Sequence, residues 1–236
     1  MAMNAISSIG FDADDTLWES EVFFSQVEKK FTQLINSYEV EADIGKELYE
    51  TEKRNLSKLG YGVKSFTLSM IESSHHLTQG SISSADTVQI VQWGKELLHH
   101  PVNLLPGVVD VLSRLQGHFA IYVITKGDNF HQQQKFVDSG LATFVTDIEI
   151  VQEKDSKAYK AILTKMGVAP EEFLMVGNSV RSDILPVLEI GSQAVHIPHE
   201  TTWQYETEDT ERNDENNYTT LESIRELPDF LSSMNS

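Results

Sequence analysis

The sequence alternates β-rich and helical segments, and one long gap in that alternation constrains the fold more than any other feature. Short apolar, β-rich runs occur at residues 5–12, 119–125, 144–151, 173–178 and 192–198, and the middle runs are dominated by Val, Ile, Phe and Tyr. Such runs, which lack a clean polar alternation, are typical of strands buried on both faces. Segments of helical length separate the last four runs, so we expect βαβ units and a parallel sheet.

The gap lies between the first and second β-rich runs, from Trp18 to about Val102. No strand-like run occurs there, and the pattern is helical over residues 21–38, 44–60, 64–77 and 84–100. A segment of this length is too long for a crossover connection. We therefore predict an α/β core formed by residues 1–17 and 103–236, with an all-α domain, residues 18–102, inserted into it.

The helices between the last four strands carry recognisable boundary residues. Asp128 is a plausible N-cap of the first helix and Gly140 its C-terminal stop, while Gly167 ends the second. Pro186 lies inside the third helical pattern, where we expect it to kink the helix or to shorten its first turn.

Composition narrows the class of protein. The chain of 236 residues has a formal charge of −18, which argues against a nucleic-acid-binding scaffold, because such a protein would show a basic stripe. An anionic substrate is not excluded, since exposed charges more than about 8 Å apart are largely screened at physiological ionic strength. No run approaches the roughly 18 apolar residues that span a bilayer, and the first residues do not resemble a secretory signal. There are no cysteines, so we expect no disulfides. Together, these observations predict a cytoplasmic protein without membrane or nucleic-acid partners.

Part of the acid is concentrated near the C-terminus. Residues 200–217 hold seven acidic residues and one arginine. We interpret this stretch as a solvated loop, and a metal or partner site is the alternative.

Polar and charged residues follow four of the predicted strands directly. They are Asp12, Asp14, Thr125, Lys154, Asn178 and Asp183. The carboxyl ends of parallel strands meet at one edge of the sheet, where ligands bind in open α/β folds. Each residue alone has an ordinary structural explanation, but their joint placement predicts a site.

The segment FDADDTLW, residues 11–18, matches the DxDxT signature of the haloacid dehalogenase-like (HAD) hydrolases. The segments that contain Thr125, Lys154 and Asp183 resemble the family's other three motifs and occur in the same order. The resemblance spans essentially the whole chain. It implies a Rossmann-like core with a helical cap between the first and second motifs.

The two carboxylates of the first motif suit phosphoryl transfer. An ionised carboxylate attacks phosphorus without a base to activate it, so Asp12 fits a nucleophile that forms an aspartyl-phosphate. Asp14 fits the general acid that later acts as base, and we expect the crowded carboxylates to raise its pKa. Asp15 is better explained by local hydrogen bonding.

Attack by one anion on another requires a cation. The resemblance implies Mg²⁺ bound by Asp12, Asp183 and the backbone carbonyl of Asp14. Many relatives carry an acid where this chain has Asn178, whose amide oxygen still suits a cation but brings less charge.

The remaining candidates bind the substrate. By resemblance, Thr125 and Lys154 bind the phosphate, and the lysine also keeps Asp12 ionised. Lys126, next in the chain, is a further candidate. In the helical insertion, the glycine-punctuated segment at residues 59–66 could direct Tyr61 and Lys64 at a substrate, and a plain turn between helices is the alternative.

Two other features of the insertion have structural explanations. We expect Trp18 to pack where the chain leaves the core. The histidine pairs at residues 75–76 and 99–100 point in divergent directions on a helix, so we do not expect them to bind metal.

Several functions are compatible with these residues. The leading hypothesis is a Mg²⁺-dependent phosphatase that acts on a small phosphorylated metabolite. A phosphomutase would use the same chemistry, and a ligand-binding relative with little or no turnover is motivated by Asn178. Asp14 argues against a dehalogenase, because a departing halide needs no proton. The oligomeric state and the physiological substrate do not follow from the sequence.

Overall fold

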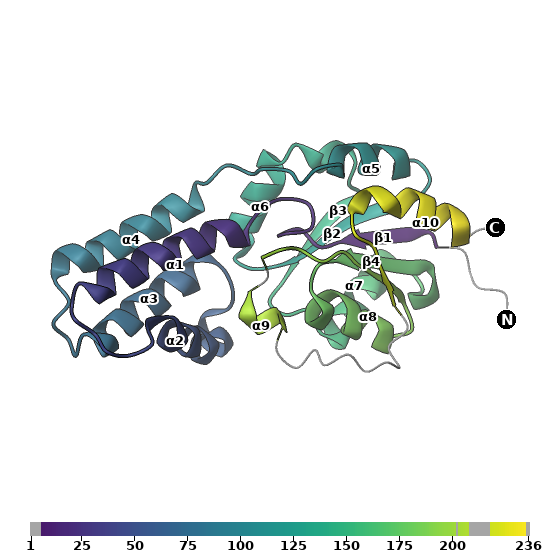
Figure 1. The fold of residues 1–236 in the computed structure, drawn as a ribbon. Helices are drawn as coiled ribbons and strands as arrows, with labels where there is room; N and C mark the ends of the chain where they lie inside the picture. The colour runs from purple at the N-terminus through teal and green to yellow at the C-terminus, as the bar shows by residue number, and fades with distance from the viewer. Residues whose placement is uncertain (1–5, 202, 208–217, 235–236) are drawn as a thin grey trace. The chain divides into compact units, whose positions relative to one another are not determined.

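The computed structural model of the chain describes residues 6–201, 203–207 and 218–234. Its centre is a sheet of parallel strands in the order β3-β2-β1-β4-β5-β6 (Figure 1). The strands are β1 Ser8–Phe11, β2 Ala120–Lys126, β3 Asp147–Val151, β4 Phe173–Gly177, β5 Gln193–His196 and β6 Thr219–Thr220. The five predicted strands and the parallel arrangement are confirmed. The two-residue strand β6 was not predicted.

The long insertion between β1 and β2 is helical, as predicted. It contains α1 Glu21–Asn36, α2 Ile44–Leu59, α3 Val63–Leu77 and α4 Ser84–Leu98. The remaining helices are α5 Val108–Leu115, α6 Asn129–Asp138, α7 Ser156–Met166, α8 Leu185–Glu189, α9 Gln204–Thr207 and α10 Leu227–Met234. In the described part of the chain, no helix is long and apolar enough to cross a membrane.

The chain divides into two compact units. The helical unit comprises Ser20–Pro101 together with Gly127–His131, and the sheet unit comprises the remaining described residues. This division places residues 18, 19 and 102 with the sheet unit and groups the short segment after β2 with the helical unit. The inserted domain at residues 18–102 stays a prediction.

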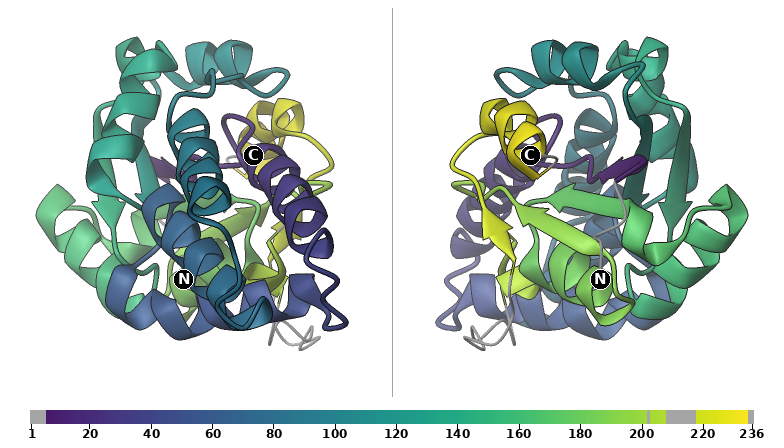
Figure 2. Two further views of the ribbon diagram at one scale, coloured as in Figure 1. Left: turned by 90° about the vertical axis from the view of Figure 1, so that its left-hand side faces the viewer. Right: turned by 90° about the vertical axis from the view of Figure 1, so that its right-hand side faces the viewer.

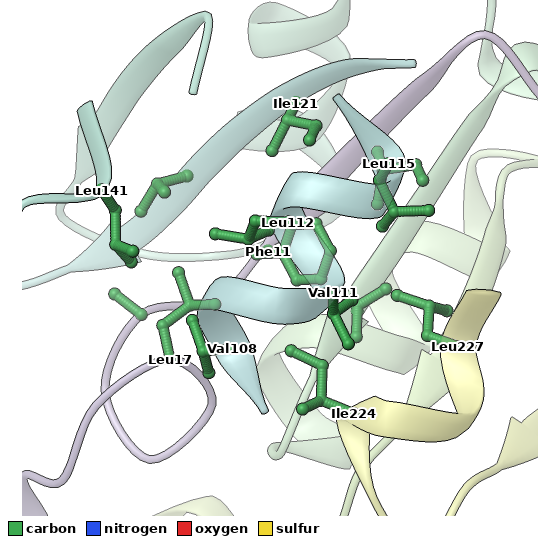
Figure 3. Packing of buried hydrophobic residues seen from close by; sticks show 14 of the residues in the cluster. Phe11, Leu17, Val108, Val111, Leu112, Leu115, Ile121, Leu141, Ile224 and Leu227 are labelled. Carbon is green, nitrogen blue, oxygen red and sulfur yellow. The ribbon is translucent and has the colours of Figure 1, made fainter. Parts of the chain in front are cut away.

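Alternation along the strands gives the sheet two apolar faces. On one face, Ile9 and Phe11 of β1 belong to a core shared with α5 and α10. In Figure 3, α5 directs Leu112 toward Phe11, while Val111 lies beside the C-terminal segment that carries Leu227. These contacts fix one layer of helices over the first strand.

The opposite face packs against α7 and α8. Its buried residues include Met175 of β4, Tyr159 of α7 and Val187 of α8. Figures 1 and 2 show α5 and α10 on one side of the sheet and α7 and α8 on the other. Gly10 of β1 faces this second layer, and a Cβ there would lie 2.6 Å from the ring of Phe173. The close approach explains why this buried strand has a glycine here.

The helical unit has its own core, which explains why an insertion of this length can be ordered. Phe31 and Ile35 of α1, Leu48 of α2, Met70 of α3 and Ile90 of α4 are completely buried in one cluster.

Two helices of this unit begin with a side-chain cap, as expected from residues with short polar side chains. Asp43 accepts a hydrogen bond from the backbone N–H of Lys46, and Ser83 accepts one from Asp86.

The predicted helix boundaries in the core are confirmed. Asp128 accepts a hydrogen bond from the N–H of His131 at 3.0 Å, and Gly140 and Gly167 follow their helices with φ of 70° and 69°. The helix that contains Pro186 is shortened. A π-helical turn, Val180–Ile184, precedes α8, which has the proline near its start.

Candidate active site

The turn after β1 positions the first two candidate residues. The backbone N–H of Asp12 donates to the carbonyl of Val176 on β4, 2.9 Å away, so Asp12 still belongs to the sheet. The chain then turns around the carbonyl of Ala13, which accepts from the N–H of Leu17 at 2.8 Å. Asp15 has φ of 62° and donates its N–H to the carbonyl of Trp18. Aspartate tolerates this left-handed conformation, which supports the local structural role expected for Asp15.

The ammonium group of Lys154 connects two carboxylates. It lies after β3 and donates to Oδ1 of Asp12 and to Oδ1 of Asp183, the latter at 2.7 Å. Lys154 is 3 % exposed and Asp183 is 1 % exposed. A buried cation between two carboxylates has a large desolvation cost that these ion pairs offset. The carboxyl ends of β1, β3 and the π-helical turn after β4 are thereby joined.

Asp183 approaches the end of β4 very closely. A Cβ on Gly177 would overlap the Asp183 carboxylate, and Oδ2 of Asp183 accepts the backbone N–H of Ser179 at 3.0 Å. Glycine is therefore needed at residue 177 because the Asp183 carboxylate leaves no space for a side chain, and not because the backbone adopts a left-handed conformation.

Asn178 joins the same group through a hydroxyl. Oγ1 of Thr16 lies 3.2 Å from Oδ2 of Asp12 and 3.2 Å from Oδ1 of Asn178. The hydroxyl has one proton, so it donates to one of these acceptors at a time. Asp12, Asn178 and Asp183 thus present oxygen atoms to a common region.

Burial shifts the pKa values of Asp12 and Lys154. Desolvation raises the pKa of Asp12, and the neighbouring Asp183 adds to this, so that it reaches about 7 in spite of the Lys154 charge. Burial alone would lower the pKa of Lys154, but Asp12 and Asp183 raise it above its ordinary value. The lysine therefore stays charged, and the surplus negative charge of the two carboxylates favours a further cation.

The pKa of Asp14 departs from the expectation. Burial raises the pKa of this carboxyl, but the charge of Lys135 and hydrogen bonds from Lys135, Gln132 and Trp18 outweigh burial and lower it. The predicted increase was wrong, because the nearest charge to Asp14 is a lysine on α6. Nothing in the local sequence around Asp14 indicates this partner.

Thr125 belongs to the cluster through Gln132. The threonine is 1 % exposed, and its Oγ1 accepts from Nε2 of Gln132 at 2.8 Å. The same nitrogen donates to Oδ2 of Asp14 at 2.9 Å. Thr125 is therefore linked to the second aspartate of the DxDxT segment.

Lys126 forms an ion pair with Glu206, an acidic residue of the stretch that we predicted to be a solvated loop. Its Nζ lies 2.6 Å from Oε1 of Glu206 and 2.8 Å from Oγ of Ser182. Oε2 of Glu206 accepts from Ser182 at 2.6 Å and also from Ser179. The solvated-loop interpretation is wrong for Glu206, whose side chain is 13 % exposed. Residue 202 and residues 208–217 of that acidic stretch lie outside the described residues.

The candidates in the insertion belong to the helical unit. Lys64 forms an ion pair with Asp128 at 2.8 Å within that unit. A substrate-binding role for Tyr61 and Lys64 stays a prediction.

The histidine pairs have local partners. Nδ1 of His76 lies 3.1 Å from Glu47, and Nδ1 of His99 lies 2.7 Å from the carbonyl of Lys95. Over the described ranges, no three His, Cys, Asp or Glu side chains converge in a metal-binding group. The residues near Lys154 are two carboxylates, Asp12 and Asp183, and the amide of Asn178. They therefore include only two side chains of the types that define such a group.

Four side chains at this edge of the sheet were not predicted as site residues. They are Thr16, Gln132, Lys135 and Glu206. Thr16 was detectable, since it is the last residue of the DxDxT segment. Gln132 and Lys135 lie three positions apart, which places them on one face of α6, but only the fold directs that face toward Asp14. Glu206 had no signal apart from its charge.

Comparisons with known proteins agree with this architecture. A family model described as haloacid dehalogenase-like hydrolase matches residues 6–191. A haloacid dehalogenase-like family hydrolase from Xanthomonas campestris is 36 % identical, with a TM-score of 0.86 over 98 % of this chain and 92 % of that one. The putative HAD-hydrolase YfnB from Bacillus subtilis, solved with bound magnesium, has a TM-score of 0.65 and 18 % identity over 97 % of this chain and 99 % of its own.

A curated relative extends the comparison to a named activity. The glyceraldehyde 3-phosphate phosphatase of Methanothermobacter thermautotrophicus is 24 % identical over 96 % of this chain and 100 % of its own length. The family model covers most of the chain, and the DxDxT segment, Lys154 and Asp183 meet at one edge of the parallel sheet. The protein therefore belongs to the haloacid dehalogenase-like hydrolases.

Proposed function

We propose that the protein is a Mg²⁺-dependent phosphatase that hydrolyses a small phosphorylated metabolite through a phospho-aspartate intermediate on Asp12. The observation that carries this proposal is the buried lysine that holds Asp12 and Asp183 together, with Asp14 two residues further along the chain. A dehalogenase needs only the nucleophile. Phosphoryl transfer also needs a proton donor for the leaving alkoxide, and Asp14 supplies one.

The residues at the site fit magnesium. Asp12, Asp183 and Asn178 offer only oxygen donors, which is the ligand type that Mg²⁺ prefers. Two carboxylates face one lysine, which leaves a net negative charge for the ion to neutralise. When bound, Mg²⁺ would supply positive charge at the phosphoryl oxygens. The magnesium described for the Bacillus subtilis structure supports this assignment.

The chain's own residues account for both chemical steps. In the first step, a carboxylate oxygen of Asp12 bonds to phosphorus as the bond from phosphorus to the ester oxygen breaks. The acid form of Asp14, which the charge of Lys135 disfavours in the substrate-free protein, gives its proton to the leaving oxygen. In the second step, Asp14 takes a proton from water as the water oxygen bonds to phosphorus. The bond from phosphorus to Asp12 breaks, inorganic phosphate leaves, and both carboxyl groups return to their initial states.

In this scheme, Lys154 and Thr125 bind the phosphoryl group. The ammonium of Lys154 is oriented by Asp183 and Asp12, so its positive charge is already in place when charge develops on the phosphoryl oxygens. Because these groups are held by the protein, little reorganisation accompanies the reaction.

The relatives guide the choice of substrate. A glyceraldehyde 3-phosphate phosphatase is among the proteins similar to this chain over its full length, so a triose phosphate is the first compound to test. We propose a small phosphate monoester of this kind as the substrate class.

A phosphate-release assay over a panel of phosphorylated metabolites, with and without Mg²⁺, tests the proposal. We expect release that requires Mg²⁺ and is abolished in Asp12→Asn. Activity that survives this substitution would refute the assignment. Transfer of phosphate to a sugar hydroxyl would identify a phosphomutase, and binding without release at every Mg²⁺ concentration would identify a non-catalytic relative.

A further inference from the structure

Three donors fix the carboxylate of Asp14. Its Oδ1 accepts from Nε1 of Trp18 at 2.7 Å and from Nζ of Lys135 at 2.5 Å. Its Oδ2 accepts from Nε2 of Gln132 at 2.9 Å. An ionised carboxylate has about four acceptor positions, so three are filled and one remains, on Oδ2.

Burial of Lys135 costs desolvation free energy, which its contacts with Asp14 and Trp18 offset. This lysine is 4 % exposed, and removing an ammonium group from water is strongly unfavourable. The ring of Trp18 lies 5.9 Å from Nζ of Lys135, within the range of a cation–π contact. Trp18 therefore supports Lys135 with its ring and Asp14 with its N–H.

Packing alone does not explain Gln132. It is 2 % exposed, and its Oε1 is buried without a hydrogen-bond partner among the described residues. An unsatisfied buried acceptor is destabilising, and an apolar side chain of similar size would avoid this cost. The amide is held by its nitrogen, which lies 2.9 Å from Oδ2 of Asp14, 2.8 Å from Oγ1 of Thr125 and 2.7 Å from the carbonyl oxygen of Lys126. The NH₂ group has two protons, so it donates to two of these acceptors at a time.

The neighbouring glutamines serve as an internal comparison. The sequence reads QQQK at residues 132–135, and only Gln132 and Lys135 of these four are buried. Their spacing of three places both on the face of α6 that meets Asp14, while Gln133 and Gln134 are exposed.

We propose that Lys135 and Gln132 are positioning residues that hold the carboxyl group of Asp14 in the orientation required for catalysis. The inference rests on the phosphatase function proposed above. Proton transfer requires the donor and acceptor to be within hydrogen-bond distance, and a carboxylate without these contacts would rotate among other side-chain conformations. Gln132 also links Asp14 to Thr125, so the acid and the phosphate-binding hydroxyl share one support.

The test compares substrates that differ in their need for the acid. The value of kcat/KM for an ester reports steps up to phosphoryl transfer to Asp12. An alkyl phosphate, with glyceraldehyde 3-phosphate as the first trial, has a poor leaving group, whereas nitrophenyl phosphate leaves without protonation. In Lys135→Met and Gln132→Met, we expect kcat/KM for the alkyl ester to fall about 100-fold, the scale of a misplaced catalytic group. The loss for nitrophenyl phosphate should be about ten times smaller, since an acid contributes little there.

Matched variants separate positioning from general damage. Gln133→Met makes the same change one residue away at an exposed position and should leave both substrates unaffected. Lys135→Arg retains the charge and should restore most of the alkyl-ester activity. Circular dichroism and thermal unfolding identify any variant that fails to fold. If Lys135→Met does so, Gln132→Met and Lys135→Arg carry the comparison.

A double-mutant cycle decides whether the two residues act through Asp14. Adding Lys135→Met to Asp14→Asn should cause little further loss, since coupled groups are not additive. Equal losses for the two substrates, or full additivity with Asp14→Asn, would overturn the inference. Activity that survives Asp12→Asn would instead refute the phosphatase mechanism, so the two failures are distinguishable.

Discussion

Nζ of Lys154 lies 2.7 Å from Oδ1 of Asp183, and both side chains are almost completely shielded from solvent. The same ammonium bonds Asp12, so one positive charge holds two buried carboxylates that would otherwise repel each other. The stability of the sheet unit and the proposed binding of a divalent cation therefore depend on the same group of atoms.

Lys154→Met is expected to destabilise the metal-free protein by about 3–5 kcal/mol, the usual cost of leaving a buried charge without its partner. Magnesium should recover more stability in this variant than in the unchanged protein, because it then provides the only cation between the carboxylates. Urea unfolding in EDTA and in Mg²⁺ measures both effects.

Lys165→Met is the matched control for this change. Lys165 pairs with Glu149 at 2.6 Å, but its side chain is 64 % exposed, so the loss of stability should be far smaller than in Lys154→Met. Equal destabilisation by the two substitutions, or an identical response to Mg²⁺, would contradict the assignment of Lys154.

Asn178→Asp should have opposite effects with and without metal. The substitution adds a third carboxylate near Asp12 and Asp183, so in EDTA like-charge repulsion should lower the unfolding temperature. With Mg²⁺ the added charge should strengthen binding about tenfold, which corresponds to about 1.4 kcal/mol. Calorimetric titration with Mg²⁺ gives the affinity, and an unchanged or weaker affinity would exclude Asn178 from the metal site.

Much of the fold could be predicted because the core strands are short, apolar and separated by helices with clear boundaries. β1 and β4 have this character, and the glycines after α6 and α7 mark where those helices end. Segments that depend on tertiary contacts were missed. The two-residue strand β6 follows residues outside the described chain, and α9 contributes Glu206 to a network that no local pattern indicates.

The candidate site also contains residues that could be predicted from the sequence and residues that could not. Residues at strand ends, such as Asp12 and Lys154, could be located because topology alone brings the ends of parallel strands together. The environment of Asp14 could not, since Lys135 is 121 positions away in sequence and reaches it only through the packing of α6. The direction of the Asp14 pKa shift depends on that contact.

Gly177→Ala and Gly10→Ala are expected to destabilise the protein similarly and to differ in activity. A Cβ on either residue meets a packed neighbour, the Asp183 carboxylate or the Phe173 ring, and overpacking of this kind costs about 1–3 kcal/mol. Only Gly177→Ala displaces a residue of the site. Phosphate release per folded molecule should therefore fall in Gly177→Ala alone, and an equal fall in Gly10→Ala would show that general strain is responsible.

Glu206 should make stability depend on pH in the acid range. Burial raises the pKa of its carboxyl, but the charge of Lys126 and hydrogen bonds from Lys126, Ser179 and Ser182 lower it below the ordinary value of 4.5. A depressed pKa means that the folded state binds the proton less readily than the unfolded state. The stabilisation is therefore complete above pH 4.5 and is lost as the pH falls through the lower pKa of the folded protein.

Glu206→Gln removes the charge and keeps the size of the side chain. We expect it to destabilise the protein by about 2 kcal/mol at pH 7, the scale of a hydrogen bond to a charged group, and by clearly less near pH 3. Glu200→Gln, on an exposed residue of the same acidic stretch, controls for the change in net charge and should have little effect at either pH. A destabilisation by Glu206→Gln that is the same at both pH values would show that the carboxylate is held by packing and not by its charge.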